Sequence, residues 1–307
     1  MAVRNFLGVF GHVVLDHILS VPTLPVPDRT VRVLARHRTF GGTGGNIARI
    51  AARLGVPTAL ASFVGEDFPD DYRSALKASG VDLRDLRSVR GYGTATVWIF
   101  SDPKGNQTAV VDQGPMAHAS KFALLTHAVT SSRVVHLGTG RPEYYRRVAA
   151  LAERLGKVIA FDPSQEIHYV YTAASFLGLL RRADYFFGNE PEVLAALRFA
   201  RLRRSRDLLR YVDVVVRTRG ERGSEVMAAD GTTPIPALRP RRVVDVTGAG
   251  DAYRAGFYAG LHRGYDPVRC AFLGSSVASF VVEAAGTQTN IPTWDDALAR
   301  ASRHAQF

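Results

Sequence analysis

The chain has 307 residues, of which 46% are hydrophobic and 22% charged, a composition typical of an ordinary globular protein. No apolar run approaches the ~20 residues of a membrane-spanning helix, so we expect no membrane partner. A single cysteine, Cys270, excludes an internal disulfide and a cysteine-rich zinc site, which fits a cytoplasmic location.

The formal net charge of +11 raises the question of a nucleic-acid partner. The arginines are, however, spread along the whole chain, and the densest run, residues 198–210, is interpreted as the solvated side of a helix. Aromatic residues do not interleave with basic ones in a known RNA- or DNA-binding motif. We therefore expect small anionic substrates and no dedicated nucleic-acid partner.

Short apolar strands alternate with helical patterns, which predicts a mostly parallel sheet covered by helices. The helix expected over residues 46–55 repeats Ile47, Ile50 and Leu54 on one face. A late helix should start at the N-cap Asp266 and lie centrally, because it is apolar nearly all round. The strands are expected at residues 5–11, 58–65, 133–138, 157–162, 183–189 and 213–218.

Two segments interrupt this alternation. Residues 30–40 alternate apolar and basic side chains, and residues 93–114 have the pattern of a β-hairpin that turns at residues 102–106. Such strands could form a small sheet that projects from the core. That sheet would either cover a site or merely extend an edge.

The segment DVTGAGD, residues 245–251, ends an apolar run and opens a helical pattern. Gly248 and Gly250 allow the backbone to approach a ligand closely. The first amides of a helix starting here would stabilise a phosphoryl oxyanion, and Asp251 could accept a proton from an attacking hydroxyl. The alternative is a plain turn whose aspartate complements the helix dipole.

A second glycine-rich segment, FGGTGGNIARI at residues 40–50, precedes the first predicted helix. Here a glycine pair could act as a hinge or let a substrate lie against the backbone, and Asn46 offers both a donor and an acceptor. The alternative is a turn with Asn46 as the N-cap. Neither segment fits the P-loop or the dinucleotide-binding pattern.

Together, in this order and separation, the two segments resemble the signatures of the PfkB/ribokinase family of carbohydrate and nucleoside kinases. The similarity covers essentially the whole chain and is greatest to the family's archaeal nucleoside kinases. It implies one ribokinase-like domain over residues 1–307, with a doubly wound, mostly parallel sheet flanked by helices. The inserted segments, at about 15–40 and 92–114, would form a small β-sheet lid.

The activity implied is transfer of the γ-phosphoryl group of ATP, with Mg²⁺, to the ribose 5′-hydroxyl of a nucleoside such as inosine, guanosine, cytidine or adenosine. A ribokinase- or fructokinase-type sugar kinase would share every catalytic residue. A hypothesis of another class is a non-catalytic nucleotide- or RNA-binding protein. A K⁺ site, with Asp245 as its side-chain candidate, and a homodimer through the lid strands are also compatible with the family.

The resemblance assigns the catalytic roles residue by residue. Asp251 would be the base, and the amides of Gly248, Ala249 and Gly250 would form the anion hole. Asp16, placed at the end of the first strand, would bind the ribose hydroxyls together with Gly42 and Asn46.

The nucleotide side is assigned in the same way. Glu192, in the N-x-x-E pattern with Asn189, would order the hydration shell of Mg²⁺. Thr218, Gly220 and Gly223 match the family's nucleotide loop, in which Arg219 replaces the usual lysine. Candidates to face the substrate from the lid are Trp98, Phe100 and Gln113. The histidines without metal-ligand spacing, expected to be structural or solvent-facing, are His12, His17, His37 and His136.

Overall fold

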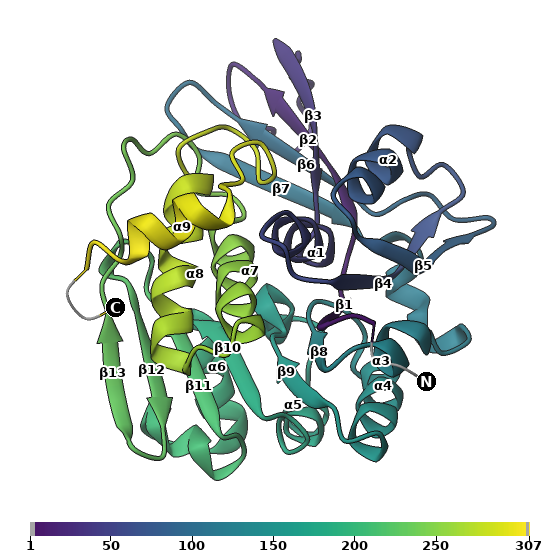
Figure 1. Ribbon diagram of the computed structural model, residues 1–307. Helices are drawn as coiled ribbons and strands as arrows, with labels where there is room; N and C mark the ends of the chain where they lie inside the picture. Colours follow the sequence, from purple (N-terminus) through teal and green to yellow (C-terminus); the bar gives the residue numbers. More distant parts are fainter. Residues whose placement is uncertain (1–3, 305–306) are drawn as a thin grey trace.

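The computed structural model describes residues 4–304 and 307, and it contains two β-sheets (Figure 1). The larger sheet has nine strands in the order β13-β12-β11-β10-β9-β8-β1-β4-β5. All neighbouring pairs are parallel except those of β12 with β11 and with β13, so the expected mostly parallel sheet is confirmed. The strands are β1 (Leu7–Phe10), β4 (Thr58–Gly65), β5 (Asp82–Val89), β8 (Val134–Leu137), β9 (Val158–Phe161), β10 (Tyr185–Asn189), β11 (Val214–Thr218), β12 (Ser224–Ala228) and β13 (Gly231–Ile235).

Helices cover both faces of this sheet and enclose two apolar cores. Because side chains alternate along a strand, Val214 and Val216 enter one core while Val215 enters the other. The first core is covered by α1 (Thr43–Arg53), α2 (Asp70–Ala78), α7 (Ala249–His262), α8 (Pro267–Val281) and α9 (Trp294–Ala301). The second is covered by α3 (His127–Ser131), α4 (Pro142–Arg154), α5 (Ala173–Leu180) and α6 (Glu190–Ala200).

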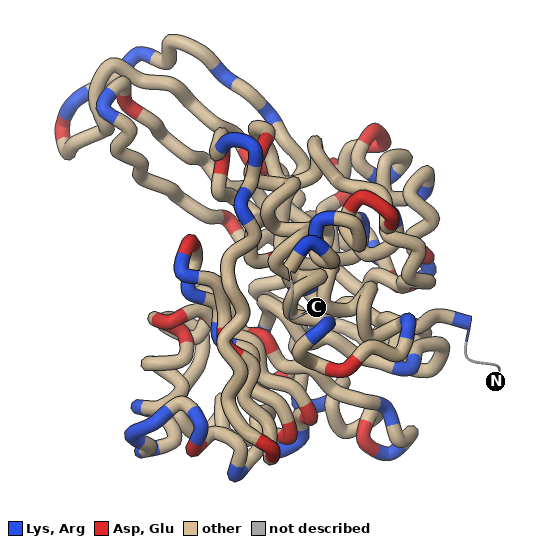
Figure 2. The backbone as a smooth tube through the Cα atoms, turned by 60° about the vertical axis from the view of Figure 1, so that its left-hand side comes forward, with Lys and Arg blue, Asp and Glu red and all other residues tan. Residues whose placement is uncertain are grey.

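The smaller sheet has the order β3-β2-β6-β7 and projects from the body as an arm (Figure 2). We call it the lid sheet. It consists of β2 (Val14–Ser20), β3 (Ala35–Gly41), β6 (Thr96–Ser101) and β7 (Gln107–Asp112). The hairpin expected within residues 93–114 is confirmed by the antiparallel pairing of β6 with β7. Movement of this sheet over a substrate stays a prediction.

Asp16 does not end the first strand, as the sequence suggested, but lies within β2 of the lid sheet. The apolar run is divided after Phe10 because the chain there crosses from one sheet to the other. At the crossing Gly11 packs directly on Gly44, where an added Cβ would lie 2.7 Å from the Gly11 carbonyl oxygen. Asp16 therefore approaches the site from the lid sheet and not from the body.

Two helix boundaries also differ from expectation. Helix α1 begins at Thr43, so Asn46 lies inside the helix and Gly42, with φ 85°, is the N-cap. The arginine-rich run 198–210 is not one helix, because α6 ends at Ala200 and Arg201 adopts the left-handed conformation. A short 3-10 helix, η3 (Ser205–Arg210), follows.

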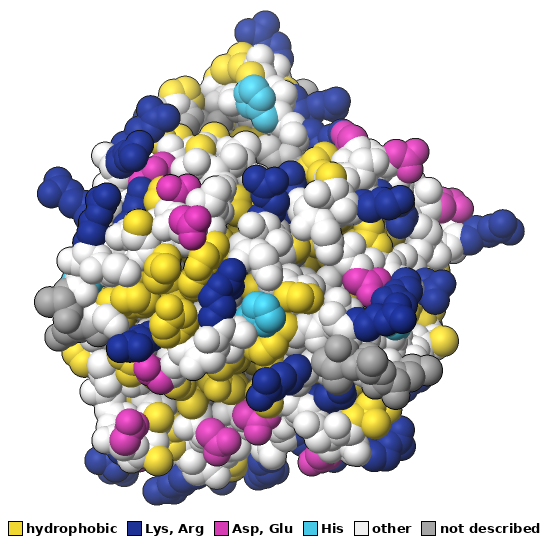
Figure 3. All heavy atoms as spheres, viewed as in Figure 1, with side chains coloured by type: hydrophobic (Ala, Val, Ile, Leu, Met, Phe, Trp, Pro, Cys, Tyr) yellow, Lys and Arg dark blue, Asp and Glu magenta, His cyan; other side chains and the backbone are white. Residues whose placement is uncertain are grey.

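On the face shown in Figure 3, Lys and Arg lie around apolar patches and do not gather in one stripe. Within residues 4–304, no helix is long and apolar enough to cross a membrane.

Candidate active site

A cavity of about 310 Å³ lies between the lid sheet and the carboxyl ends of the parallel strands. It opens at the carboxyl ends of the neighbouring strands β1 and β8. The strand order reverses between these two, because β4 and β5 follow on the side of β1 and β9 and β10 on the side of β8. Such a switch point is the usual place for a ligand in an open α/β sheet. The sequence-predicted residues that line the cavity are Asp16, Gly42, Asn46, Gln113, Gly248 and Asp251. Segments more than 200 residues apart thus meet at one site.

Asp251 lies in the first turn of α7, which begins as predicted at the DVTGAGD segment. Gly248 is the N-cap with φ 75°, and a Cβ there would lie 2.6 Å from Thr287 Cγ2, so the turn requires glycine. The amide of Ala249 donates to the Val246 carbonyl at 3.2 Å, whereas those of Gly248 and Gly250 have no acceptor among the described residues. Two of the three amides expected in the anion hole are therefore free.

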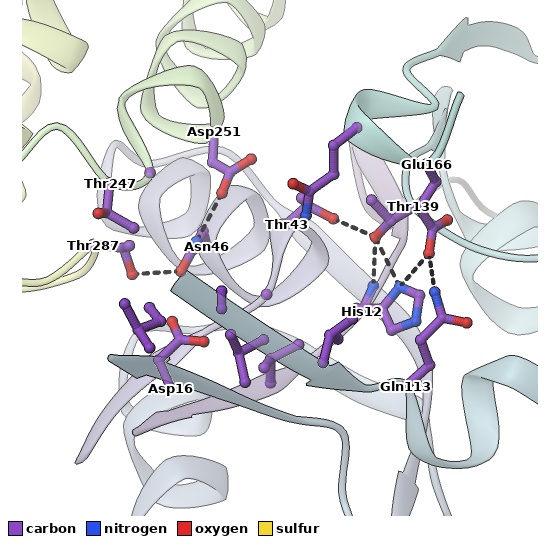
Figure 4. Close-up of a pocket in the computed structure, with 18 of the residues that line it drawn as sticks. His12, Asp16, Thr43, Asn46, Gln113, Thr139, Glu166, Thr247, Asp251 and Thr287 are labelled. Atoms are coloured by element: carbon purple, nitrogen blue, oxygen red, sulfur yellow. Dashed lines mark hydrogen bonds and ion pairs between the residues drawn. The ribbon is translucent and has the colours of Figure 1, made fainter. Parts of the chain in front are cut away.

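The Asp251 carboxylate accepts a hydrogen bond from Asn46 Nδ2 at 2.7 Å (Figure 4). Burial raises the pKa of Asp251 to about 6, although the Asn46 hydrogen bond and the charge of Arg254 both lower it. Asn46 Oδ1 accepts from Thr287 Oγ1 at 2.8 Å and from Gln288 Nε2 at 2.7 Å. These contacts fix the amide so that its NH₂ group faces Asp251.

Asp16 presents a second carboxylate to the same cavity, and no described residue hydrogen-bonds to it. Its pKa is raised to about 6 by burial first and then by the charges of Asp251 and Asp245. A Cβ on Gly41 would lie 2.0 Å from Asp16 Oδ2, so this carboxylate fits only against a glycine. The free oxygens can accept hydrogen bonds from ligand hydroxyl groups.

At the other end of the cavity lies a polar network that sequence reasoning missed. Glu166 accepts from Gln113 Nε2 at 2.6 Å and from the Gly140 amide at 2.5 Å, and burial raises its pKa to about 7. His12 Nδ1 is 2.8 Å from Thr139 Oγ1. Thr139 and Glu166 lie in the segments GTGRPEY (138–144) and FDPSQE (161–166), outside the two glycine-rich segments to which the sequence pointed.

His12 is buried in this network, contrary to a solvent-facing role. Burial lowers its pKa to about 4, so the ring is neutral near pH 7. Its Nε2 has no hydrogen-bond partner within the described structure, in which it is fully covered. The ring follows β1 and Thr139 follows β8, so the pairing of these two strands brings them together.

The lid sheet contributes an apolar wall. Val97 pairs with Val111 and Ile99 with Ala109, and all four side chains line the cavity. By the same alternation Trp98 and Phe100 face away, and of the three lid candidates only Gln113 reaches the site. Sequence reasoning lacked the strand register that decides this.

A second cavity, of about 500 Å³, lies on the other side of the α7 N-terminus. Ala249 and Gly250 line it, as do Thr218, Gly220 and Gly223 of the predicted nucleotide loop. Arg219 does not, and instead pairs with Glu225 at 3.0 Å. The remaining wall is mostly apolar and includes Leu238, Pro240, Val243, Val246, Ala278 and Val282. One turn of chain, residues 247–251, thus separates the two cavities.

Asn189 and Glu192 lie outside the described lining of both cavities. They form a capping box at the start of α6, in which the Glu192 carboxylate accepts from Asn189 N at 2.7 Å and from Asn189 Nδ2 at 3.0 Å. In the part of the chain that the structure describes, no three His, Cys, Asp or Glu side chains could together hold a metal ion. The Glu192 carboxylate is thus held by Asn189, and its role toward Mg²⁺ stays a prediction.

The pfkB family carbohydrate kinase model matches residues 4–294. The chain belongs to this family. It is 36% identical over 300 residues to a nucleoside kinase of Methanothermobacter thermautotrophicus, a match that covers 97% of this chain and 95% of the relative. The protein is accordingly a kinase that transfers a phosphoryl group to a hydroxyl acceptor.

Solved structures agree with this membership. The nucleoside kinase of Methanocaldococcus jannaschii, described as an archaeal member of the ribokinase family, superposes with a TM-score of 0.91 at 32% identity, covering 99% of this chain and 100% of that one. The nucleoside kinase of Burkholderia thailandensis in complex with inosine shares the fold, with a TM-score of 0.86 at 24% identity over 98% and 97% of the two chains. The ribokinase-like fold expected from the motifs is therefore confirmed.

Proposed function

We propose that the protein phosphorylates the ribose 5′-hydroxyl of nucleosides with ATP as donor. The observation that carries this proposal is the position of Asp251, whose carboxylate faces the first cavity from the turn that separates it from the second. A nucleoside in the first cavity and the triphosphate in the second would meet at this turn. Nucleoside kinases are also among the relatives above 30% identity.

In the proposed reaction deprotonated Asp251 accepts the proton of the 5′-hydroxyl. The 5′-oxygen then attacks the γ-phosphorus, and the bond from that phosphorus to the β–γ bridging oxygen breaks, releasing ADP. The free amides of Gly248 and Gly250 would stabilise the transferred group, and the Ala249 amide could join them if it left Val246. Since the pKa of Asp251 lies at about 6, the base is available above that pH.

The nucleotide would lie in the second cavity, with its phosphates at Gly220 and Gly223 and its base against the apolar wall. Magnesium would reach the protein through water ordered by Glu192 and would neutralise charge on the phosphates. Glu192 is held in place by Asn189, and burial raises its pKa.

One feature of the first cavity supports a nucleoside over a free sugar. Asp16 and Asn46, beside Asp251, suit the hydroxyls of either a free or a nucleoside-bound ribose. The wall of Val97, Ile99 and Val111 beyond them suits the flat apolar faces of a nucleobase, and the polar side chain of Gln113 suits its edge. A free sugar would leave this apolar wall without a matching surface.

The test measures ADP release with Mg-ATP against inosine, guanosine, cytidine, adenosine, ribose and fructose, with Asp251→Asn in parallel. We expect turnover on nucleosides and a loss of about 10²-fold or more in the variant, the scale of general-base catalysis. ADP affinity should be unchanged, because the second cavity is intact. Turnover on free sugars alone would contradict the nucleoside assignment, and full activity of the variant would contradict the role of Asp251.

A further inference from the structure

One buried ion pair near the site has no part in the reaction described above. Arg254 lies one turn after Asp251 in α7 and Asp162 directly follows β9, and their side chains are 6% and 5% exposed. Arg254 Nε donates to Asp162 Oδ2 at 2.6 Å and Nη2 donates to Asp162 Oδ1 at 3.2 Å. The guanidinium thus joins α7 to the carboxyl end of the central sheet.

The third guanidinium nitrogen is directed at the catalytic turn. Arg254 Nη1 donates to the carbonyl oxygen of Gly250 at 3.2 Å, between the two free amides and Asp251. A Cβ on Gly250 would lie only 3.0 Å from the same nitrogen. The guanidinium carbon also stands 5.8 Å from the centre of the Phe187 ring on β10. These contacts hold the side chain from three elements.

Burial of such a pair is poor evidence for a gain in stability, because the cost of removing two charges from water is large. Stability therefore does not explain the Arg254–Asp162 pair, whereas its geometry indicates a role at the catalytic turn. Arg254 itself lines neither cavity among the described residues, so it does not reach a ligand from this position. It reaches the turn that does.

We propose that Arg254 is a positioning residue for phosphoryl transfer. Anchored on Asp162, it holds the Gly250 carbonyl and so fixes the first turn of α7, with its amides and Asp251, relative to the sheet. This inference rests on the proposed roles of Asp251 and of the turn. A misplacement of about 1 Å can cost about 10²-fold in rate, so a single hydrogen bond here has a measurable effect on kcat.

The charge of Arg254 has a second effect on the base. Among the groups around Asp251, Arg254 and the Asn46 hydrogen bond lower its pKa, while Asp162 raises it. Two further carboxylates, those of Asp16 and Glu192, lie near Asp251. The negative charge of Asp251 contributes to raising the pKa of each. Loss of the positive charge at Arg254 would raise the pKa of Asp251, so that the base is protonated at a higher pH.

The experiment compares Arg254→Lys with the double variant Arg254→Met/Asp162→Asn, which removes both charges and leaves no lone buried ion. For each we would measure thermal unfolding, ADP affinity, the KM for ATP and for inosine, and kcat between pH 5 and 9. The control is Arg182→Met/Glu153→Gln, which removes an exposed Arg–Glu pair.

We expect the folded double variant to lose about tenfold or more in kcat, with both KM values and ADP affinity within about twofold of wild type. Arg254→Lys keeps the charge but not the planar fork, so its kcat should fall while the acid limb of its pH profile stays in place. The control should behave as wild type. A merely structural pair would change thermal unfolding and leave kcat of the folded enzyme unchanged.

A folded double variant with wild-type kcat would overturn the inference, as would a loss expressed only in KM or ADP affinity. If the double variant does not fold, Arg254→Lys decides, because wild-type kcat there would show that the fork is not needed. Asp251→Asn in the same assay distinguishes a failure of the proposed base from a failure of the proposed role of Arg254. If that variant stays active, the assigned base is wrong. If it is inactive while the Arg254 variants match wild type, only the role of Arg254 fails.

Discussion

Asn46 Nδ2 lies 2.7 Å from Asp251 Oδ2, although 205 residues separate the two in the chain. The other end of the amide is held by Thr287 Oγ1, which lies 2.8 Å from Asn46 Oδ1 and 3.0 Å from the carbonyl oxygen of Phe40. The single hydroxyl proton of Thr287 is shared between these acceptors. The base is thereby connected to the end of β3 in the lid sheet, directly before α1.

Replacing Asn46 with alanine should shift the pH dependence of the reaction. The Asn46 hydrogen bond favours the ionised form of Asp251, so its loss raises a pKa that already lies at about 6. Activity requires the carboxylate, so it falls as the pH drops through this pKa. The acid midpoint of kcat/KM should therefore move to higher pH. The control is Asn106→Ala, which removes a similar Asn–Asp contact from the exposed β6–β7 turn. An unmoved midpoint with Asn46→Ala would show that the contact does not tune the base.

Gly41→Ala should weaken nucleoside binding through Asp16. The new methyl group would lie 2.0 Å from Asp16 Oδ2, so the carboxylate cannot keep its position in the cavity. We expect the KM for inosine to rise by about tenfold or more, the scale of one lost charge-assisted hydrogen bond, while the KM for ATP is unchanged. Gly178→Ala, where nothing lies within 4 Å, is the matched control and should keep wild-type kinetics. An unchanged KM for inosine would mean that Asp16 does not contact the substrate.

Substitutions at the neighbouring residues Trp98 and Ile99 of β6 should have unequal effects on nucleoside binding, because the two side chains face opposite sides of the lid sheet. Ile99 lines the cavity and Trp98 does not. Removing apolar contact at about 0.8 kcal/mol per CH₂ group predicts that Ile99→Ala raises the KM for a nucleoside by about fivefold or more. Trp98→Ala, a larger deletion, should leave it within about twofold. Equal effects of the two variants would contradict the register assigned to β6.

A carboxylate far from the site should control stability in acid. Burial alone raises the pKa of Asp82, but hydrogen bonds from Arg84, His127 and Asn5 outweigh burial and hold that pKa well below its usual range. A depressed pKa stabilises the fold above the ordinary aspartate value of about 4, and this contribution is lost as the pH falls further. Asp82→Asn should thus lower Tm at pH 7 and do so less at pH 3. Asp230→Asn, in an exposed turn, is the control. A Tm difference that does not depend on pH would show that the charge is not responsible.

Local patterns in the sequence were enough to predict six of the nine strands of the main sheet, the two-stranded hairpin of the lid and the start of α7, but not β5, β12 or β13. Each of these depends on residues close together in the chain: alternating apolar side chains, the turn at residues 102–106, and the glycines before Asp251. The prediction that Asp16 ends the first strand was wrong, because a continuous apolar run does not show where the chain passes from one sheet to another. The contact of Gly11 with Gly44 that marks the crossing is visible only in three dimensions.

The network of His12, Thr139 and Glu166 could not be predicted for a related reason. Its members follow β1, β8 and β9, and strand order alone brings them to the same end of the sheet. The burial of Arg254 could not be predicted for a different reason. It falls inside a motif that was recognised, between Tyr253 and Ala255, where a surface arginine would look the same in the sequence. Only its partner Asp162, 92 residues away, shows that it is buried.

The two cavities are separated by no more than the turn at residues 247–251, so a single molecule could occupy both at once. A nucleoside joined through its 5′-oxygen to a short chain of phosphates and a second nucleoside has the required shape. Once one end is bound, the other is held near its own cavity at an effective concentration in the millimolar range. A bisubstrate inhibitor of this design would gain affinity from geometry alone, without any contact that the separate substrates lack.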